Sequence, residues 1–230
     1  MKKRRKPMTC YHCGRPAVSR DHVPPLSFFP PGGNPDLRRN LMKVPSCQLH
    51  NGGKALDDDY VRMTLSAISK KINETEKLQY LRDHTVNALV NSEALYALML
   101  KDIRVDTRNG KNSVSGEINP IRIANFMSSV ARGLLYYERE LRWRGEVISL
   151  VHFLIDESSP QELRDQSQTL LIGETSSGAS GENKDVFYFH IFDLHGDASE
   201  FSVDMCFYRE FHVTTFFKRA SPKETDLPDL

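Results

Sequence analysis

The chain has 230 residues, of which 39% are hydrophobic, and a formal net charge of +1, as expected for one sizeable domain or two small ones with a packed core. It contains no run of about 18 or more uninterrupted apolar residues, the length that a membrane-spanning helix requires. Its charged first residues lead into Pro7, Cys10 and His12 rather than into an apolar signal segment. We therefore expect a cytoplasmic protein that does not act at a membrane.

Positive charge is concentrated in the first 54 residues. They hold eleven Lys and Arg against only Asp21 and Asp36, a net of +9, whereas the remainder of the chain carries a net of −8. Such asymmetry predicts an N-terminal part that binds a polyanion and a C-terminal part that does not. Five of the basic residues, at positions 2–6, could be only a solvated tail, but six remain without them.

Two pairs of metal-ligand residues lie in this basic part. Cys10-Tyr-His-Cys13 and Cys47-Gln-Leu-His50 share a two-residue gap, which lets each short turn direct two donors at one tetrahedral Zn²⁺. The fourth cysteine, Cys206, lies far away inside an apolar run, so the pattern is not that of a disulfide framework. The spacing predicts a structural zinc with a Cys3His ligand set.

The segment between the two pairs is longer than a zinc-finger loop. Thirty-three residues separate Cys13 from Cys47, whereas a DNA-reading finger usually has ~12 to 20. There is room for a β-hairpin with a long Pro- and Gly-rich connection, which carries an adjacent Asp21-His22 pair. Taken alone, such a pair is more often a surface turn than a catalytic centre. His12 is expected to be an exposed turn residue.

The order of the polar residues around the ligand pairs is specific. The first pair is followed by Asp21-His22-Val-Pro, by Asn40-Leu shortly before the second pair, and by Asn51-Gly-Gly-Lys54 directly after it. This arrangement resembles the motif of HNH (ββα-metal) endonucleases in its zinc-stabilised form, and the resemblance covers about residues 10–60. Without that context, Asn51 and the two glycines could simply end or turn the segment after the ligands.

The resemblance implies roles for four residues. Asp21 and Asn51 resemble the two protein ligands of a catalytic divalent ion, Mg²⁺ or Mn²⁺, and His22 resembles the general base that activates water. Asn40 matches the middle Asn of the family, which braces the loop between the hairpin strands and holds the histidine in place. The implied reaction is hydrolysis of DNA phosphodiester bonds, in a setting such as restriction or defence against invading DNA.

The residue types suit that chemistry. A hard ion such as Mg²⁺ prefers oxygen donors and keeps several waters, so one carboxylate and one amide oxygen leave coordination positions for a phosphate. An imidazole with a pKa near neutrality can accept a proton from the attacking water. The residues expected to hold the flanking nucleic-acid backbone are Arg20, Arg38, Arg39, Lys43 and Lys54.

Three features depart from the family pattern. His50 replaces the usual final cysteine, which zinc tolerates, and Asn51 stands where many relatives have histidine. The acidic run Asp57-Asp58-Asp59 follows where many relatives are more basic. One of these carboxylates could reach the catalytic ion, although a negative cluster favoured by the dipole at a helix N-terminus is the simpler interpretation.

The remaining residues predict helices and an antiparallel sheet. Apolar spacing of three to four residues indicates helices, an Asn-Gly pair indicates a turn, and dense aromatic and β-branched runs indicate strands. The predicted elements are helices at about 61–100 and 120–138, a hairpin of 103–105 with 114–117 around Asn109-Gly110, a buried strand at 147–155, a polar loop at 173–185 and meander strands within about 186–217. The predicted fold class is therefore α+β, with a small zinc-stapled ββα-metal module at 1–60 and an α+β domain at 61–230.

The C-terminal part carries no second catalytic signature, so we expect it to serve regulation, target selection or formation of a homo-oligomer. The leading hypothesis is a metal-dependent DNA endonuclease with His22 as base. One alternative is a non-catalytic zinc module that binds nucleic acid or a protein, which has no use for Asp21 together with Asn51. Another is a nuclease of the same type that acts on RNA, which these residues barely distinguish from one acting on DNA.

Overall fold

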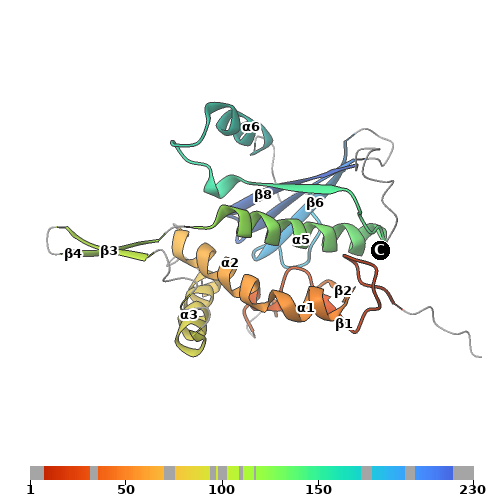
Figure 1. Cartoon of the computed structure of the whole chain (residues 1–230), viewed down its shortest axis with the longest axis horizontal. Helices are drawn as coiled ribbons and strands as arrows, with labels where there is room; N and C mark the ends of the chain where they lie inside the picture. The colour runs from red at the N-terminus through yellow and green to blue at the C-terminus, as the bar shows by residue number, and fades with distance from the viewer. Residues whose placement is uncertain are drawn as a thin grey trace, which may run out of the picture.

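The protein consists of a four-stranded antiparallel sheet, a long helix α5 (Pro120–Arg139) packed on it, and a two-stranded hairpin with helices on the far side of α5 (Figure 1). The structure is a computed structural model that describes residues 8–31, 36–69, 76–93, 97, 103–108, 111–116, 118–171, 178–194 and 200–219. This arrangement is α+β, as the sequence predicts.

The sheet is formed by strands from the C-terminal part of the chain. Its order is β5 (Glu146–Val151), β8 (Phe211–Lys218), β7 (Phe201–Phe207) and β6 (Phe187–Asp193), and each neighbouring pair is antiparallel. The last three strands coincide with the predicted meander. The strand predicted over residues 147–155 ends earlier, at Val151, because a 3-10 turn begins there. Aromatic and β-branched side chains favour these strands because they pack well on a pleated surface.

Helix α5 covers one face of the sheet and coincides with the helix predicted at 120–138. Asn119 caps it by accepting a hydrogen bond from the Arg122 backbone N–H (3.0 Å), Pro120 opens the first turn, and Glu140 ends it with φ at 52°. Its buried stripe has helical spacing and lets it contact β5, β7 and β8. The stripe consists of Ile123, Phe126, Met127, Val130, Ala131, Leu134 and Leu135.

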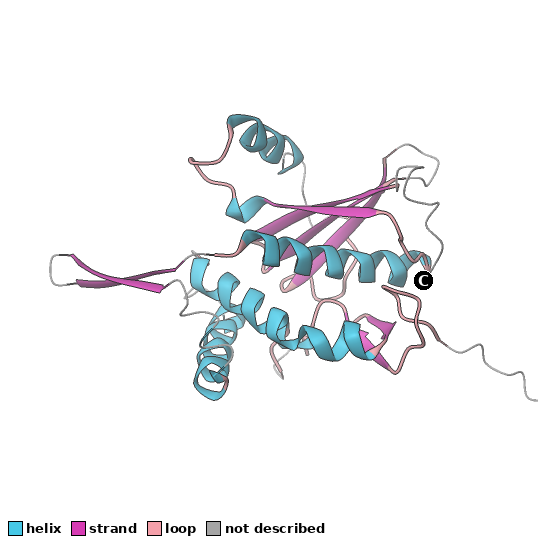
Figure 2. Ribbon diagram, in the orientation of Figure 1, coloured by secondary structure: helices cyan, strands magenta, loops and turns pink. Residues whose placement is uncertain are grey.

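Further helices and a second hairpin surround this pair of layers. Helices α2 (Ala55–Ile68) and α3 (Glu76–Asn91) occupy much of the predicted helical range 61–100, and α2 packs along α5. Strands β3 (Ile103–Arg108) and β4 (Lys111–Gly116) form the predicted hairpin, which projects from the body (Figure 2). The predicted turn, Asn109-Gly110, and residues 173–177 of the predicted polar loop lie outside the described residues. Helix α6 (Gln161–Leu171) is not among the predicted elements.

The N-terminal residues form a small hairpin followed by a helix. Strand β1 (Ser19–His22) pairs antiparallel with β2 (Lys43–Ser46). Helix α1 (Gln48–Asn51) follows after a single residue, and a 3-10 turn (Gly52–Lys54) joins it to α2. Because the connection from β2 is so short, α1 packs against both strands. The end of β1 and the start of α2 therefore lie next to each other and line one cavity.

One hydrophobic core joins this hairpin to the rest of the chain. The buried cluster contains residues from Cys10 to Phe217, and the predicted division between residues 60 and 61 falls inside α2. None of the described helices combines the length and the apolar composition that a bilayer span requires.

Two contacts fix the chain directly after His22. Gly133 of α5 lies so close to Val23 that an added Cβ would be 2.8 Å from a Val23 methyl carbon. The Tyr208 hydroxyl, after β7, donates to the Phe28 carbonyl at 2.6 Å. The end of β1 is therefore held in place by the helix and by the sheet rather than by the hairpin alone.

Candidate functional site

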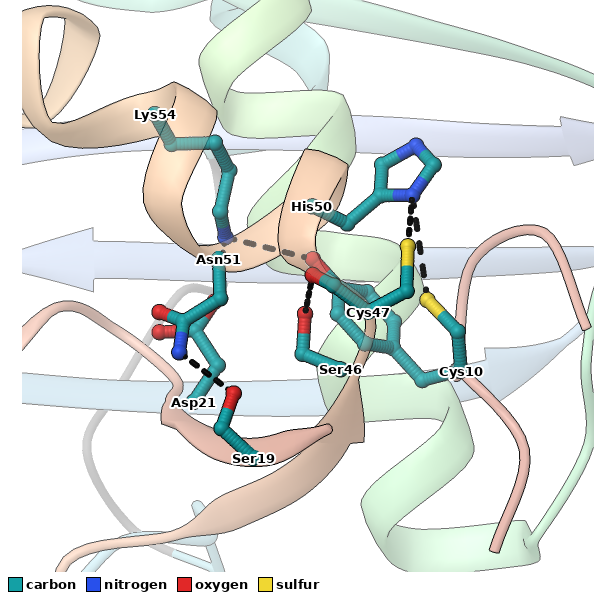
Figure 3. Close-up of polar contacts among 9 residues, drawn as sticks. Cys10, Ser19, Asp21, Ser46, Cys47, His50, Asn51 and Lys54 are labelled. Atoms are coloured by element: carbon teal, nitrogen blue, oxygen red, sulfur yellow. Dashed lines mark hydrogen bonds and ion pairs between the residues drawn. The ribbon is translucent and has the colours of Figure 1, made fainter. Parts of the chain in front are cut away.

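Four sulfur and nitrogen donors gather where the turn over residues 10–13 meets α1, and Figure 3 shows three of them, those of Cys10, Cys47 and His50. Cys10, Cys13, Cys47 and His50 each place one ligand atom within 4.8 Å of the others. His50 Nδ1 lies 3.7 Å from Cys10 Sγ and 3.3 Å from Cys47 Sγ, and the sulfurs of Cys13 and Cys47 are 3.7 Å apart. A tetrahedral site with zinc bonds of about 2.0–2.3 Å has edges of roughly 3.5–3.8 Å. The four residues are close enough to hold a metal ion, and their spacing suits zinc.

Local hydrogen bonds set the two ligand turns. In the first, the Cys10 N–H donates to the Arg15 carbonyl (2.7 Å), and the N–H of Gly14, whose φ is 78°, donates to the Cys10 carbonyl (3.0 Å). That positive φ favours glycine. In the second, the His50 N–H donates to the Cys47 carbonyl (3.1 Å). The matching gaps in the sequence therefore correspond to two tight turns that face each other.

The first ligand turn is also held from the C-terminal part of the chain. Arg142, just after α5, donates from Nε to the Cys10 carbonyl at 2.9 Å and from Nη2 to the Thr9 hydroxyl. Arg142 lies 132 residues from Cys10, and the ligand spacing gives no signal for it. The cluster is thus anchored to the core of the molecule.

The pKa values of two of the ligands, His50 and Cys13, are shifted in the direction that favours metal binding, which requires thiolates and a neutral imidazole. Burial, together with the charges of Arg15 and Lys54, lowers the pKa of His50. Burial raises the pKa of the Cys13 thiol, but hydrogen bonds from Arg15 and the neighbouring cysteines outweigh it and lower the pKa to about 7.

His12 is not the exposed turn residue that the sequence suggests. Its ring is partly buried and stacks on the ring of His50, with centroids 4.0 Å apart and planes 16° from parallel. Burial, and then the charges of His50 and Arg132, lower the pKa of His12 to about 4. His12 therefore packs as a neutral ring against a metal-type ligand, which the spacing of the ligand pairs does not reveal.

Beside the sulfur cluster, the helical segment after β2 faces β1 through polar contacts. Lys54 Nζ lies 2.5 Å from Asp21 Oδ2 and 3.3 Å from the Tyr11 hydroxyl, and Asn51 Nδ2 donates to the Ser19 hydroxyl at 2.6 Å. Figure 3 shows Asn51 and Lys54 reaching toward the strand that carries Ser19 and Asp21. Asp21, Asn51 and Lys54 therefore lie in one group, with Ser19 as a partner that the sequence did not indicate.

Lys54 is held in its charged form. Burial lowers the pKa of Lys54, but the neighbouring Tyr11 and Asp21 outweigh burial and raise the pKa above its ordinary value. The Asp21 side chain is only 12% exposed, so the Lys54 ammonium is the cation that balances it in this structure.

His22 ends β1 and shares a cavity of about 280 Å³ with Asp21. Burial lowers the pKa of His22; Lys43 and Arg38 add to this effect, and Asp21 opposes it. The imidazole is therefore largely neutral at pH 7 and able to accept a proton. The cavity is lined by Asp21, His22, Pro25, Leu26, Ser27, Ala55, Asp58 and Asp59.

The three consecutive aspartates at the start of α2 have different surroundings. Asp57 Oδ1 lies 2.5 Å from Arg122 Nη2, and Asp59 Oδ1 lies 2.7 Å from Nη2 of the fully buried Arg62. Asp58 Oδ1 is buried, and no hydrogen bond reaches it within the described part of the chain. Asp58 is thus the aspartate of the three that no arginine contacts within the described residues.

Burial raises the pKa of Asp58 to about 7; Lys54 opposes this rise, and the nearby Asp21 adds to it. The sequence contained a signal for this placement. Asn51, Lys54 and Asp58 are spaced at three and four residues, which puts them on one face of a continuous helical segment.

The predicted nucleic-acid contacts differ in accessibility. Arg20, Arg39 and Lys43 are exposed. Arg38 is partly buried and donates to a backbone carbonyl and to a tyrosine hydroxyl, at 2.9 and 3.2 Å. Lys54 is engaged by Asp21. Three of the five side chains thus offer positive charge to solvent around the hairpin.

Asn40 makes its hydrogen bond with a residue outside the Asp21 group. Its φ is 53°, and its Nδ2 donates to Glu182 Oε2 at 2.7 Å, 142 residues along the chain. Asn183 Nδ2 donates to the Arg39 carbonyl (3.4 Å). The connection between β1 and β2 is therefore braced against the loop before β6, and contact of Asn40 with His22 stays a prediction.

Comparison with known proteins gives no family for this chain. A scan against protein-family models and searches of curated proteins and of solved structures each returned no match. The function is therefore inferred from the residues and their geometry.

Proposed function

We propose that the protein is a metal-dependent HNH-type endonuclease that hydrolyses DNA phosphodiester bonds. The observation that carries the proposal is the meeting of Asp21 and His22 at one cavity beside the Cys3His cluster, with Asn51 and Lys54 reaching β1 from the helical segment after the last ligand. The order β1, β2, α1 agrees with the order of elements in a ββα-metal module.

Two different donor sets support two different metal ions. The thiolates and imidazole of the Cys3His cluster form a closed set of four donors, which suits a structural zinc. The carboxylate of Asp21 and the amide oxygen of Asn51 suit Mg²⁺ or Mn²⁺. When bound there, such an ion supplies positive charge that stabilises the phosphate and the leaving oxygen.

His22 is the proposed general base. Its lowered pKa leaves the ring free to take a proton from the water that attacks the phosphate. Lys43 lies opposite His22 in the β1–β2 register, and its charge disfavours a protonated ring. A positioned base of this kind typically contributes ~10² to 10⁴ in rate.

Lys54 has a proposed role in holding the substrate. A divalent ion on Asp21 would replace the Lys54 ammonium as the partner of that carboxylate. The ammonium would then be available to a phosphate oxygen, which lysine binds as a point charge. The exposed Arg20, Arg39 and Lys43 would contact the flanking backbone, so binding should weaken as salt rises.

A nicking assay on supercoiled plasmid DNA tests this proposal. We expect cleavage that requires added Mg²⁺ or Mn²⁺ and that is slowed ~10²-fold or more by His22→Ala. His190→Ala, which removes a partly buried imidazole from β6, is the matched control and should leave the rate unchanged. Full activity of a folded, zinc-loaded His22→Ala protein would exclude His22 as the base.

The same preparation separates the two alternatives. Labelled DNA and RNA of the same base sequence are incubated side by side with each divalent ion. Cleavage confined to RNA would change the substrate and keep the mechanism. Salt-dependent binding without cleavage of either the DNA or the RNA would exclude the nuclease and favour a non-catalytic nucleic-acid-binding module.

A further inference from the structure

We propose that Asp58 is a third protein ligand of the divalent ion assigned to Asp21 and Asn51. This inference rests on the proposed nuclease function and extends its metal site, because the sequence motif supplies only the other two ligands. It is carried by the unpartnered carboxylate oxygen of Asp58 and by the cavity that Asp58 shares with Asp21 and His22.

The first observation is the contrast between Asp58 and its neighbours. Arginines contact Asp57 and Asp59 at 2.5 and 2.7 Å. Asp58 Oδ1 is shielded from solvent and receives no hydrogen bond from any described residue. Buried polar atoms in native proteins are nearly always satisfied by protein, water or an ion. A cation in the cavity would supply the partner that this oxygen lacks.

The second observation is what surrounds the cavity. Asp58 approaches from α2, whereas Asp21 and His22 approach from β1. Carboxylate oxygens are the donors that Mg²⁺ and Mn²⁺ prefer, and a volume of about 280 Å³ is large enough for an ion that keeps several waters. The fold thus brings two carboxylates to one space from opposite elements.

The charges around the cavity are consistent with a bound cation. Lys54 contacts Asp21, and its charge also acts on Asp58. Lys43 and Arg38 act on His22. Lys54 is therefore the cation that the two carboxylates share. A divalent ion would balance both of them and would release Lys54.

A simpler interpretation treats Asp58 as a charge at a helix N-terminus, where the dipole favours acidic residues. That interpretation makes Asp57 and Asp58 equivalent, since both lie in the first turn of α2. A ligand role makes them different. The pair therefore offers a matched test, with the same charge removed from adjacent positions of one helix.

Binding of Mn²⁺ alone to the zinc-loaded, full-length protein tests the assignment without relying on activity. The loss of the free-ion signal in electron paramagnetic resonance measures affinity. We expect Asp58→Asn to weaken Mn²⁺ binding at least ~10-fold, as loss of a supporting group at a metal site typically does. Asp21→Asn should weaken it as much or more, and Asp57→Asn by less than about 2-fold.

Thermal unfolding in the absence of Mn²⁺ gives a second measurement. If Asp58 is a ligand of the ion, then without the ion Asp58→Asn removes a buried carboxylate that must share Lys54 with Asp21. The Tm should therefore rise, and the gain in Tm on adding Mn²⁺ should shrink. A lower Tm with an undiminished gain on adding Mn²⁺ would mark Asp58 as a structural carboxylate and overturn the ligand role.

The outcomes separate this inference from the function on which it rests. Unchanged Mn²⁺ affinity in Asp58→Asn, with weakened affinity in Asp21→Asn, would overturn the role of Asp58 and leave the nuclease proposal standing. If Asp57→Asn and Asp58→Asn weaken Mn²⁺ binding equally, both aspartates act only as charges at the helix N-terminus, and the ligand role of Asp58 is overturned. Unchanged affinity in all three variants would remove the divalent site and the proposed function with it.

Discussion

Two regions of the molecule hold their shape in different ways. The N-terminal region, residues 8–54, gathers four metal-type ligands and a set of short polar contacts around a two-stranded hairpin. The sheet region, β5 to β8 with α5, buries aromatic and aliphatic side chains, and Phe207 and Phe217 are fully shielded from solvent. The first region adds a cluster of metal-type ligands and polar contacts to its share of the common core, whereas the second rests mainly on apolar burial.

This difference separates substitutions that act on both fold and chemistry from those that act on the fold alone. In the N-terminal region, the segment that ends the metal cluster also carries Asn51 and Lys54. In the sheet region, no residue of the Asp21 group is present, but α5 and Tyr208 contact the chain that follows His22. Some substitutions should therefore unfold or inactivate one region alone, and substitutions at the contacts between the regions should affect both.

The largest effect should follow from breaking the metal cluster with Cys47→Ser. Structural zinc in small domains contributes on the order of 10 kcal/mol of folding free energy, and Cys47 contacts two of the other three ligands. We expect loss of bound zinc, of nicking, and of hydrogen-exchange protection over residues 10–50, while β6 to β8 stay protected. Cys206→Ser, in the sheet region, should retain the zinc. Simultaneous loss of protection in both regions would show a single cooperative unit.

The converse change is Phe189→Ala in the sheet region. Removing a fully buried phenylalanine from a packed core typically costs ~3–5 kcal/mol, and Phe189 is 0% exposed and stacks on Phe187 of the same strand. Denaturant unfolding should show that loss. Zinc content should stay at the wild-type value wherever the chain remains folded, and a fall in zinc content in step with stability would contradict the separation of the two regions.

Gly133→Ala tests the contact through which the regions meet. Helix propensity alone predicts that alanine stabilises α5 by ~1 kcal/mol. The added Cβ, however, would lie 2.8 Å from a methyl carbon of the buried Val23, so we expect a loss of about 1–3 kcal/mol in denaturant unfolding. Nicking should also slow, because Val23 follows His22. Val23→Ala in the same chain should recover part of both losses, and a gain in stability for Gly133→Ala alone would refute the close packing.

The smallest effect should come from Glu182→Gln, at the exposed contact with Asn40. A hydrogen bond near the surface is worth about 1 kcal/mol or less, so stability should change by no more than that, and Zn²⁺ content should not change. Denaturant unfolding measures the change in stability, and the nicking rate measures any change in activity. A large fall in nicking at unchanged stability would mean that the loop before β6 positions the proposed active site.

Local patterns predicted those features that depend on neighbours in the sequence. The two-residue gaps indicated the Cys3His cluster, and the helix predicted at 120–138 begins at Pro120, the first residue of α5. Aromatic runs marked β6, β7 and β8. In each case a turn, a cap or a strand face is specified within a few residues, so the physical cause is visible in the sequence.

Contacts between distant residues could not be predicted in the same way. Asn40 meets Glu182 and Arg142 meets Cys10 across more than one hundred residues, and such pairings depend on how whole elements pack. Helix α6 was missed because its polar sequence gives a weak apolar pattern, with Ser167 as its buried residue. That no described residue donates a hydrogen bond to Asp58 Oδ1 likewise depends on packing, because Arg122 and Arg62 contact Asp57 and Asp59 instead.

Trp143 is the single tryptophan of the chain. The edges of Phe201 and Phe217 meet its ring, while the preceding residue, Arg142, holds the Cys10 carbonyl. Its intrinsic fluorescence therefore reports on the place where the sheet contacts the turn that carries Cys10. Stopped-flow measurement of this single emission band can show whether the Cys10 turn detaches before or after the sheet unfolds.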